Sequence, residues 1–229
     1  METLLRSQLF FLTLTIGVYL FSVWLYKKSR LRLLHPILTS LLVIIAFLKI
    51  TGIEYEAYRE GTGLIDFMLG VSVVALGYLL YEQIHHIKGR LWTILSSVVV
   101  GSVVGILSVV WIARWMGAGE LVVLSLPAKQ VTTPIAIEIA QNSGGSAPLT
   151  SIVVIIAGIL GSIIGPFILD KLGIESKIAR GLALGSASHA VGTARAIELG
   201  AVEGAISGLA IGLMGVVTAI LAPVIEKII

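Results

Sequence analysis

The chain has 229 residues, of which 57% are hydrophobic and 13% charged, and its formal net charge is +3. A soluble domain carries about 25% charged residues, so this composition indicates a polytopic membrane protein and argues against a nucleic-acid-binding one. The chain contains no cysteine, which excludes disulfides and thiol chemistry. The long runs are continuously apolar rather than alternating, so they predict an all-α fold and not a transmembrane barrel.

Four hydrophobic elements are predicted in the first half of the chain, at residues 7–26, 34–50, 64–81 and 91–115. The basic loop at 27–32 suits the cytoplasmic side, which places the N-terminus outside, and the acidic segment 52–60 suits the outer side. The first residues lack the basic region and the small-residue cleavage site of a signal peptide. We therefore expect a multi-pass protein of a bacterial cell (inner) membrane.

The fifth element is predicted to be a broken or re-entrant helix. Pro127 and Pro134 each remove a backbone donor and disturb the preceding turn. Between them lie a lysine and two threonines, Lys129, Thr132 and Thr133. Freed backbone groups at membrane depth need a cavity or polar partners, so a solute site is expected here. The alternative for Lys129 is a side chain that extends along apolar surface to the membrane interface.

A turn is predicted at 141–148, a sixth element at 149–169 and an eighth at 204–225, with a charged loop at 170–180. The sixth element carries Gly158, Gly161 and Gly165, which are spaced three and four residues apart. This spacing predicts a face that packs closely against a neighbouring helix.

The seventh element contains the stretch 183–198, which combines two glycines with six polar or ionisable side chains: Gly185, Ser186, Ser188, His189, Gly192, Thr193, Arg195 and Glu198. Such groups are expensive in hydrocarbon, so they predict a broken helix that lines a solute site. The alternative is that they serve only packing and hydrogen bonds to helix carbonyls.

Local helical geometry would place His189 and Thr193 on one face and Ser188 with Arg195 on the neighbouring face. His189 is then either a proton carrier or a histidine bonded to a neighbouring helix. Arg195 either binds a carboxylate or pairs with Glu198.

The chain also contains a weak internal repeat. LTSLLVIIA at 38–46 resembles LTSIVVIIA at 149–157 at seven of nine positions, and each follows a proline. This predicts two membrane repeats, residues 1–118 and 119–229, with the solute site mostly in the second. The loop charges favour inverted halves, an arrangement that requires one re-entrant element.

Several motifs together resemble the LrgB/CidB family of bacterial membrane proteins. They are KQVTTPIA at 129–136, the Gly144–Gly145 turn, ARGLALG at 179–185, SHAVGTAR at 188–195 and EGAISGLA at 203–210. The family includes antiholin-like proteins linked to murein hydrolase export and autolysis, and it is related to the plastidial glycolate/glycerate translocator. Members paired with a small LrgA/CidA-type membrane protein are implicated in pyruvate uptake. Val71 and Leu79 stand where the family usually has prolines, which argues against a broken third helix.

The residues and the resemblance together predict a secondary transporter of small monocarboxylates such as glycolate, glycerate or pyruvate, working by alternating access and possibly coupled to protons. The predicted substrate-binding residues are Lys129, Thr132, Thr133, Ser188, His189, Thr193 and Arg195. The predicted helix-break residues are Pro127, Pro134, Gly185 and Gly192.

The alternative function is a holin-like or antiholin-like membrane component that modulates murein hydrolase export and autolysis. Glycine faces favour a homo-oligomer, and the resemblance implies an LrgA/CidA-type partner. We expect no cofactor, no metal and no nucleic-acid partner. We also expect no enzyme, because Asp66 and Asp170 do not form the pair that an intramembrane protease needs.

Overall fold

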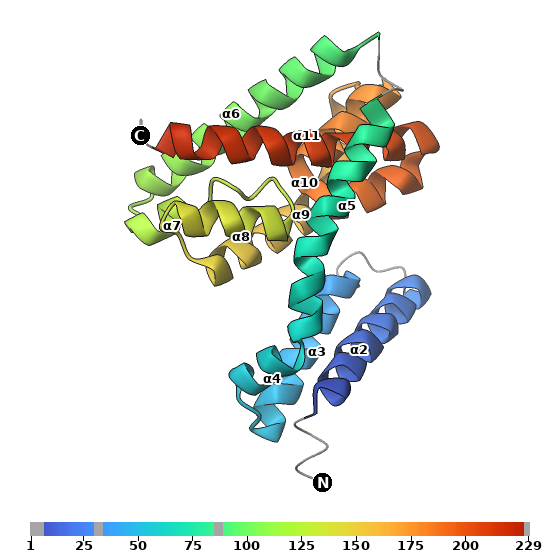
Figure 1. Ribbon diagram of the computed structural model, residues 1–229. Coiled ribbons are helices and arrows are strands. Elements are labelled where there is room, and N and C mark those ends of the chain that lie inside the picture. Colours follow the sequence, from blue (N-terminus) through green and yellow to red (C-terminus); the bar gives the residue numbers. More distant parts are fainter. Residues whose placement is uncertain (1–6, 30–33, 85–88, 227–229) are drawn as a thin grey trace. The chain divides into compact units, whose positions relative to one another are not determined.

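The computed structural model describes residues 7–29, 34–84 and 89–226, and these residues form helices without any strand. The all-α prediction is therefore confirmed. Contacts divide the chain into two compact units, Met1–Ser72 and Val73–Ile229, with the boundary inside α5 (Gly63–Ile84). Each unit is described by itself below, with its helices labelled in Figure 1.

The first unit contains α2 (Gln8–Ser29), α3 (Pro36–Thr51), α4 (Tyr55–Gly61) and the start of α5. Its centre is the fully buried Phe11, whose ring meets the Tyr58 ring edge-on at 5.6 Å. The Tyr58 hydroxyl lies 2.9 Å from Thr15 Oγ1. The short helix α4 was not predicted, because its polar sequence indicates a loop. It forms here because its aromatic face packs on α2.

The second unit contains the rest of α5 and six further helices: α6 (Leu91–Trp115), α7 (Glu120–Ser125), α8 (Thr133–Asn142), α9 (Ala147–Lys171), α10 (Lys177–Leu199) and α11 (Ala201–Glu226). Its hydrophobic core joins Val98 and Ile106 of α6, Val154 of α9, and Leu209 and Met214 of α11. These helices form the packed bundle that carries the candidate site.

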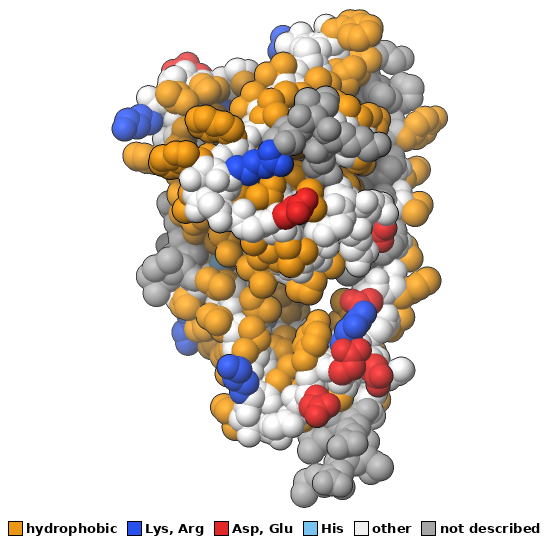
Figure 2. Space-filling view, turned by 90° about the vertical axis from the view of Figure 1, so that its left-hand side faces the viewer, with side chains coloured by type: hydrophobic (Ala, Val, Ile, Leu, Met, Phe, Trp, Pro, Cys, Tyr) orange, Lys and Arg blue, Asp and Glu red, His pale blue; other side chains and the backbone are white. Residues whose placement is uncertain are grey.

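Within the described residues, four helices are long and apolar enough to cross a membrane: Gln8–Ser29, Leu91–Trp115, Ala147–Lys171 and Ala201–Ile225. Figure 2 shows hydrophobic side chains over much of the visible face, with charged side chains gathered in a few places. Trp111 and Trp115 near the end of α6 are 74% and 81% exposed, as expected for side chains at a membrane interface. The structure thus agrees with a multi-pass membrane protein.

The observed helices follow most of the predicted elements. The third element is the continuous helix α5, in keeping with Val71 and Leu79 in place of prolines. The turn at 141–148 is confirmed, with Gly144 at a φ of 80° between α8 and α9. The basic loop at 27–32 lies partly outside the described residues. The division into repeats at residues 118 and 119 stays a prediction.

Candidate functional site

Helix α10 is broken at His189, in the centre of the stretch that the sequence singled out. His189 has φ 42° and ψ −132°, and among the described residues it is the one non-glycine residue with a positive φ. The broken helix predicted for the seventh element is therefore confirmed. A non-glycine residue in this region costs of order 1–3 kcal/mol and persists only where its surroundings hold it.

The contacts of His189 show what holds it. Its side chain is buried, and Nε2 lies 2.9 Å from the carbonyl oxygen of Val154 on α9. A carbonyl oxygen only accepts, so Nε2 carries the hydrogen and donates it. Gly158 makes room for the ring, because a Cβ there would lie 2.6 Å from His189 Cε1.

Beyond the break, α10 turns back on itself. A Cβ on Gly192 would lie 2.3 Å from the carbonyl oxygen of Leu184, eight residues earlier in the chain. In a straight helix, eight residues span about 12 Å along the axis, so this approach requires a sharp bend. Gly192 is needed where the two halves, 177–188 and 190–199, come together.

Both ends of α10 lie against the same residue of α11. A Cβ on Gly181 would meet the carbonyl oxygen of Glu203 at 2.4 Å, and a Cβ on Gly200 would meet Glu203 Oε2 at 2.4 Å. Further along, Gly185 and Thr193 both approach Ser207, the second through a 2.7 Å contact between Thr193 Oγ1 and Ser207 Oγ. The first half of α10 thus runs along α11 and the second half returns. Helix α10 is therefore a helical hairpin whose two ends lie beside the first turn of α11, which is the arrangement of a re-entrant element.

The bend of this hairpin lies well along α11 from the residue at which α11 begins. Gly185 packs on Ala210, which is nine residues after Ala201, the first residue of α11. Nine residues correspond to about 14 Å along the helix axis. The bend at His189 lies one turn beyond Gly185. For a helix α11 that spans the roughly 30 Å hydrocarbon layer from Ala201, this position is near the midplane.

The fifth element is also broken, as predicted. Helix α7 ends at Ser125, residues 126–132 form irregular turns, and α8 begins at Thr133. Pro127 is buried in the irregular segment, whereas Pro134 lies in the first turn of α8 and so starts a helix rather than breaking one. Ser125 Oγ accepts a 2.8 Å hydrogen bond from the backbone N–H of Ser146. The end of α7 and the turn that follows α8 therefore lie together, which is the arrangement of a second re-entrant element.

Helix α9 connects the two breaks. Thr150 Oγ1 donates a 2.9 Å hydrogen bond to the carbonyl oxygen of Ser125, and Val154, one turn further, accepts from His189. Along α11, Ala210 contacts α10 and Gly215 faces Ile135 in the first turn of α8. Ala210 and Gly215 are about 7.5 Å apart along the axis. Because Gly185 lies one turn before the bend, the bend of α10 and the start of α8 lie at similar positions along α11. A solute site between these elements stays a prediction.

Each break carries a buried hydroxyl without a hydrogen-bond partner in the described part of the chain. One is Thr132 Oγ1, at the residue before α8, and the other is Ser188 Oγ, at the residue before the bend. A buried hydroxyl without a partner costs about 1–3 kcal/mol. Ser186 Oγ on α10 and Glu203 Oε2 on α11 also lack a partner among the described residues, so such atoms are not confined to the two breaks. The solute site predicted at the breaks stays a prediction.

The two predicted positive charges have different surroundings. Lys129 lies half-buried in the irregular segment, and no hydrogen bond or ion pair of its ammonium is found among the described residues. Arg195 forms a 2.5 Å ion pair with Glu198 and is about one third exposed. The structure therefore shows the alternative that the sequence left open for Arg195.

Three predicted placements change in the structure. Ser188 and Arg195 do not lie on the same face of one helix, because the bend at His189 separates them. Gly185 lies one turn before the break, where its missing side chain lets α10 approach Ser207. The Thr193 hydroxyl contacts Ser207 of α11 instead of facing a solute cavity. Thr133 is the first residue of α8.

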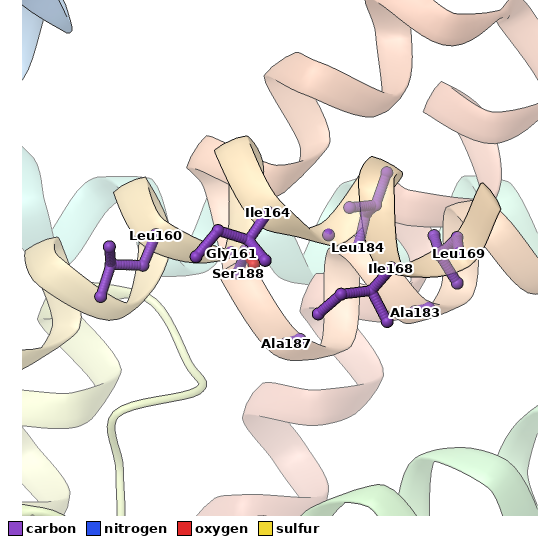
Figure 3. A pocket seen from close by; sticks show the side chains of 10 residues that line it. Leu160, Gly161, Ile164, Ile168, Leu169, Ala183, Leu184, Ala187 and Ser188 are labelled. Carbon is purple, nitrogen blue, oxygen red and sulfur yellow. The ribbon is translucent and has the colours of Figure 1, made fainter. Parts of the chain in front are cut away.

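The glycine stripe of α9 is the face that packs on α10, as predicted. A Cβ on Gly161 would lie 1.8 Å from Ser188 Oγ, and a Cβ on Gly165 would lie 2.7 Å from Leu184 Cδ2. Beside this contact lies a groove of about 400 Å³ lined by Leu160, Ile164 and Ile168 of α9 and by Ala183 and Ala187 of α10, as Figure 3 shows. Among the residues that the structure describes, Ser188 is the one polar side chain in its lining and no charged side chain is present, so the groove does not suit a carboxylate.

Sequence reasoning missed a buried polar cluster next to Lys129. It consists of Gln130, Ser102 of α6 and Thr218 of α11. The signal was available, since all three are polar residues in apolar surroundings, but nothing in the sequence indicates that they meet. Among the described residues there is no group of three His, Cys, Asp or Glu side chains that could hold a metal ion.

Together, these features define the class: a multi-pass helical membrane protein whose core contains two re-entrant broken elements. The LrgB-like family model matches residues 15–228, and the chain belongs to this family. No solved structure matches the chain.

Three relatives illustrate how far the similarity extends. YxaC of Bacillus subtilis (strain 168) is 40% identical over 212 residues, covering 93% of this chain and 92% of the relative. The holin-like protein CidB of Staphylococcus epidermidis is 36% identical over 212 residues, covering 93% of each chain. The antiholin-like protein LrgB of Bacillus cereus is 34% identical over 215 residues, covering 93% of this chain and 94% of the relative.

Proposed function

We propose that the protein is a secondary transporter of small monocarboxylates such as glycolate, glycerate or pyruvate. The observation that supports this proposal is that two broken elements pack against the same two helices, α9 and α11, and that each carries a buried hydroxyl without a partner among the described residues. Irregular backbone at membrane depth is tolerated where it lines a cavity, and discontinuous helices at the midplane are typical of secondary transporters.

The chemistry at this depth suits an anion. Helix α8 and the second half of α10 both begin there, and a helix N-terminus presents free N–H groups and a partial positive charge. Lys129 adds a full positive charge, and the Thr132 hydroxyl can bond a carboxylate or the oxygen beside it, whereas the Ser188 hydroxyl lies against Gly161 at the apolar groove between α9 and α10. In this proposal Lys129 is the main cationic group, because Glu198 neutralises Arg195.

The test is uptake of labelled pyruvate, glycolate and glycerate into proteoliposomes that contain this chain alone, with and without a proton gradient. We expect saturable uptake by the wild-type protein and its loss in Lys129→Ala. The matched control is Lys177→Ala, which removes an exposed lysine at the start of α10. Normal uptake in a folded Lys129→Ala variant overturns the assignment of this residue, and dependence on the gradient would make His189 the first candidate for a proton carrier.

A second function is favoured by the relatives. Two of them carry the names holin-like protein CidB and antiholin-like protein LrgB, and these names support a holin-like or antiholin-like role more directly than they support transport. Under that function the chain is a membrane component that modulates murein hydrolase export. It predicts a leak that does not saturate with solute, or no flux at all, together with an effect on autolysis when the chain is expressed in cells.

We further propose that the chain resides in the inner membrane of a bacterium, forms a homo-oligomer and works with a small LrgA/CidA-type membrane protein. The names of the relatives support the partner, and the glycine faces support the oligomer. Co-expression with such a partner is the next measurement if the chain alone shows no flux.

A further inference from the structure

The buried cluster beside Lys129 links three separate elements of the second unit. Gln130 lies in the irregular segment 126–132, is 3% exposed, and reaches α6 and α11 through its side-chain amide. Its Nε2 lies 3.3 Å from the carbonyl oxygen of Ser102, 3.2 Å from Ser102 Oγ and 3.4 Å from Thr218 Oγ1. Because the carbonyl oxygen accepts only, the amide group that faces it must be the NH₂ group.

The site is shaped for this side chain. A Cβ on Gly105 of α6 would lie 1.8 Å from Gln130 Oε1 and 2.9 Å from its Cδ, so only glycine leaves the space. One turn earlier, a Cβ on Gly101 would meet nothing closer than Met214 Cε at 3.7 Å. The two glycines of α6 are therefore not equivalent, and Gly105 is needed for Gln130.

The segment that Gln130 anchors is held by burial and by a few hydrogen bonds. Pro127, Ala128 and Val131 are buried, the last two in the hydrophobic core. The backbone makes two turn-type hydrogen bonds within the segment, from Lys129 N to the Leu126 oxygen at 3.1 Å and from Val131 N to the Ala128 oxygen at 3.2 Å, and the Thr132 oxygen accepts from Ala136 N. Next to Lys129, the Gln130 amide adds the polar attachment to α6 and α11.

We infer that Gln130 is a positioning residue: it fixes the irregular segment 126–132 to α6 and α11 and thereby holds Lys129 at the depth of the α8 N-terminus. Ser102 and Thr218, whose hydroxyl oxygens are 3.0 Å apart, are the docking point on the two long helices. The inference rests on the proposed function for its consequence in transport, but the placement of the segment is tested independently of it.

The test uses a single cysteine at position 129 in the otherwise cysteine-free chain, and it measures the rate of reaction with a charged thiol reagent. In Gln130→Leu we expect this rate to rise roughly tenfold, the effect of losing one or two buried hydrogen bonds. Gln130→Leu should fold, since Ser102 and Thr218 still bond each other. Gln141→Leu is the same change at an exposed position of α8. It should leave the rate within about twofold of that of the Lys129→Cys protein without a second substitution.

Gly105 and Gly101 of α6 provide the second part of the labelling experiment. Gly105→Ala is expected to reproduce the fast labelling of Gln130→Leu, and Gly101→Ala to resemble the wild type. Adding Gly105→Ala to Gln130→Leu should change the rate little further, because the side chain that the new methyl group displaces is already gone. Equal rates in Gln130→Leu and Gln141→Leu, or in Gly105→Ala and Gly101→Ala, overturn the inference. If Gln130→Leu is not recovered from membranes, Ser102→Ala replaces it, with a smaller rise in the same direction.

Uptake measurements on proteins that keep Lys129 separate the transport function from the positioning role of Gln130. Gln130→Leu should raise the half-saturation concentration of the solute roughly tenfold with a smaller change in the maximal rate, while Gln141→Leu and Gly101→Ala change neither. The predicted labelling pattern without uptake, both for the chain alone and with an LrgA/CidA-type partner, overturns the transport function and leaves the positioning role standing. Saturable uptake with a flat labelling pattern overturns the positioning role alone.

Discussion

At the scale of single residues, His189 combines a strained backbone with a side-chain anchor. Glycine adopts positive φ at no steric cost, whereas alanine keeps the strain and both lose the bond to Val154. We therefore expect His189→Ala to lower the free energy of unfolding by about 1 kcal/mol more than His189→Gly. Thermal unfolding of the two purified variants measures the difference, and an alanine variant as stable as the glycine variant would show that position 189 does not hold the bend.

A charge exchange tests whether Arg195 acts through its ion pair with Glu198 or binds the solute. Arg195→Glu alone places two acids three residues apart, and it should reduce stability by about 0.2–1 kcal/mol. The double exchange Arg195→Glu with Glu198→Arg rebuilds the pair, so we expect stability and uptake to return together. Restored stability with uptake still absent would mean that Arg195 itself binds the solute.

The residues of the site were only partly predictable. The sequence pointed to 183–198 because polar side chains stand between apolar runs, and the break does lie there. It favoured Gly185 and Gly192 as break positions, because a positive φ is normally left to glycine. The bond to Val154 and the space at Gly158 hold His189 in that conformation instead, and both come from a helix distant in sequence.

At the scale of helices, the packing of α9 on α10 depends on Gly161. Gly161→Ala places a methyl group 1.8 Å from Ser188 Oγ, so we expect a loss of about 1–3 kcal/mol in the free energy of unfolding. Gly208→Ala is the control, because a Cβ there meets nothing within 4 Å. Helix propensity should make that variant as stable as the wild type or up to about 1 kcal/mol more stable.

Chemical denaturation of both variants, followed by helix content, provides the comparison. Combining Gly161→Ala with Ser188→Ala removes the hydroxyl that the new methyl group meets, so part of the lost stability should return. Similar stability of Gly161→Ala and Gly208→Ala would contradict the close approach of α9 and α10.

The elements themselves were more predictable than their paths. Prolines correctly indicated a broken fifth element, and glycine spacing correctly indicated the packing face of α9. That α10 returns to its starting side was not predictable, because 23 residues are enough to cross a bilayer. The inverted arrangement of the two halves stays a prediction.

At the scale of the whole molecule, the paths of α9, α10 and α11 fix which loops share a side of the membrane. Single cysteines at Glu175, before α10, and at Ala201, after it, should react with an impermeant reagent from the same side, and a cysteine at Gln141 from the opposite side. Labelling of intact cells and of inverted vesicles measures this. Glu175 and Ala201 on opposite sides would mean that α10 crosses the membrane.

The hairpin of α10 also has a consequence for how the chain is made. Its stretch 183–198 is too polar to be inserted on hydrophobicity alone, whereas α9 and α11 are strongly apolar along their length. The contacts that surround the bend come from both adjacent helices: Val154 and Gly158 lie on α9, and Ser207 lies on α11. We therefore expect α10 to reach its final packing only after α11 has left the ribosome and entered the bilayer, so that the proposed solute site would be the last part of the protein to be assembled.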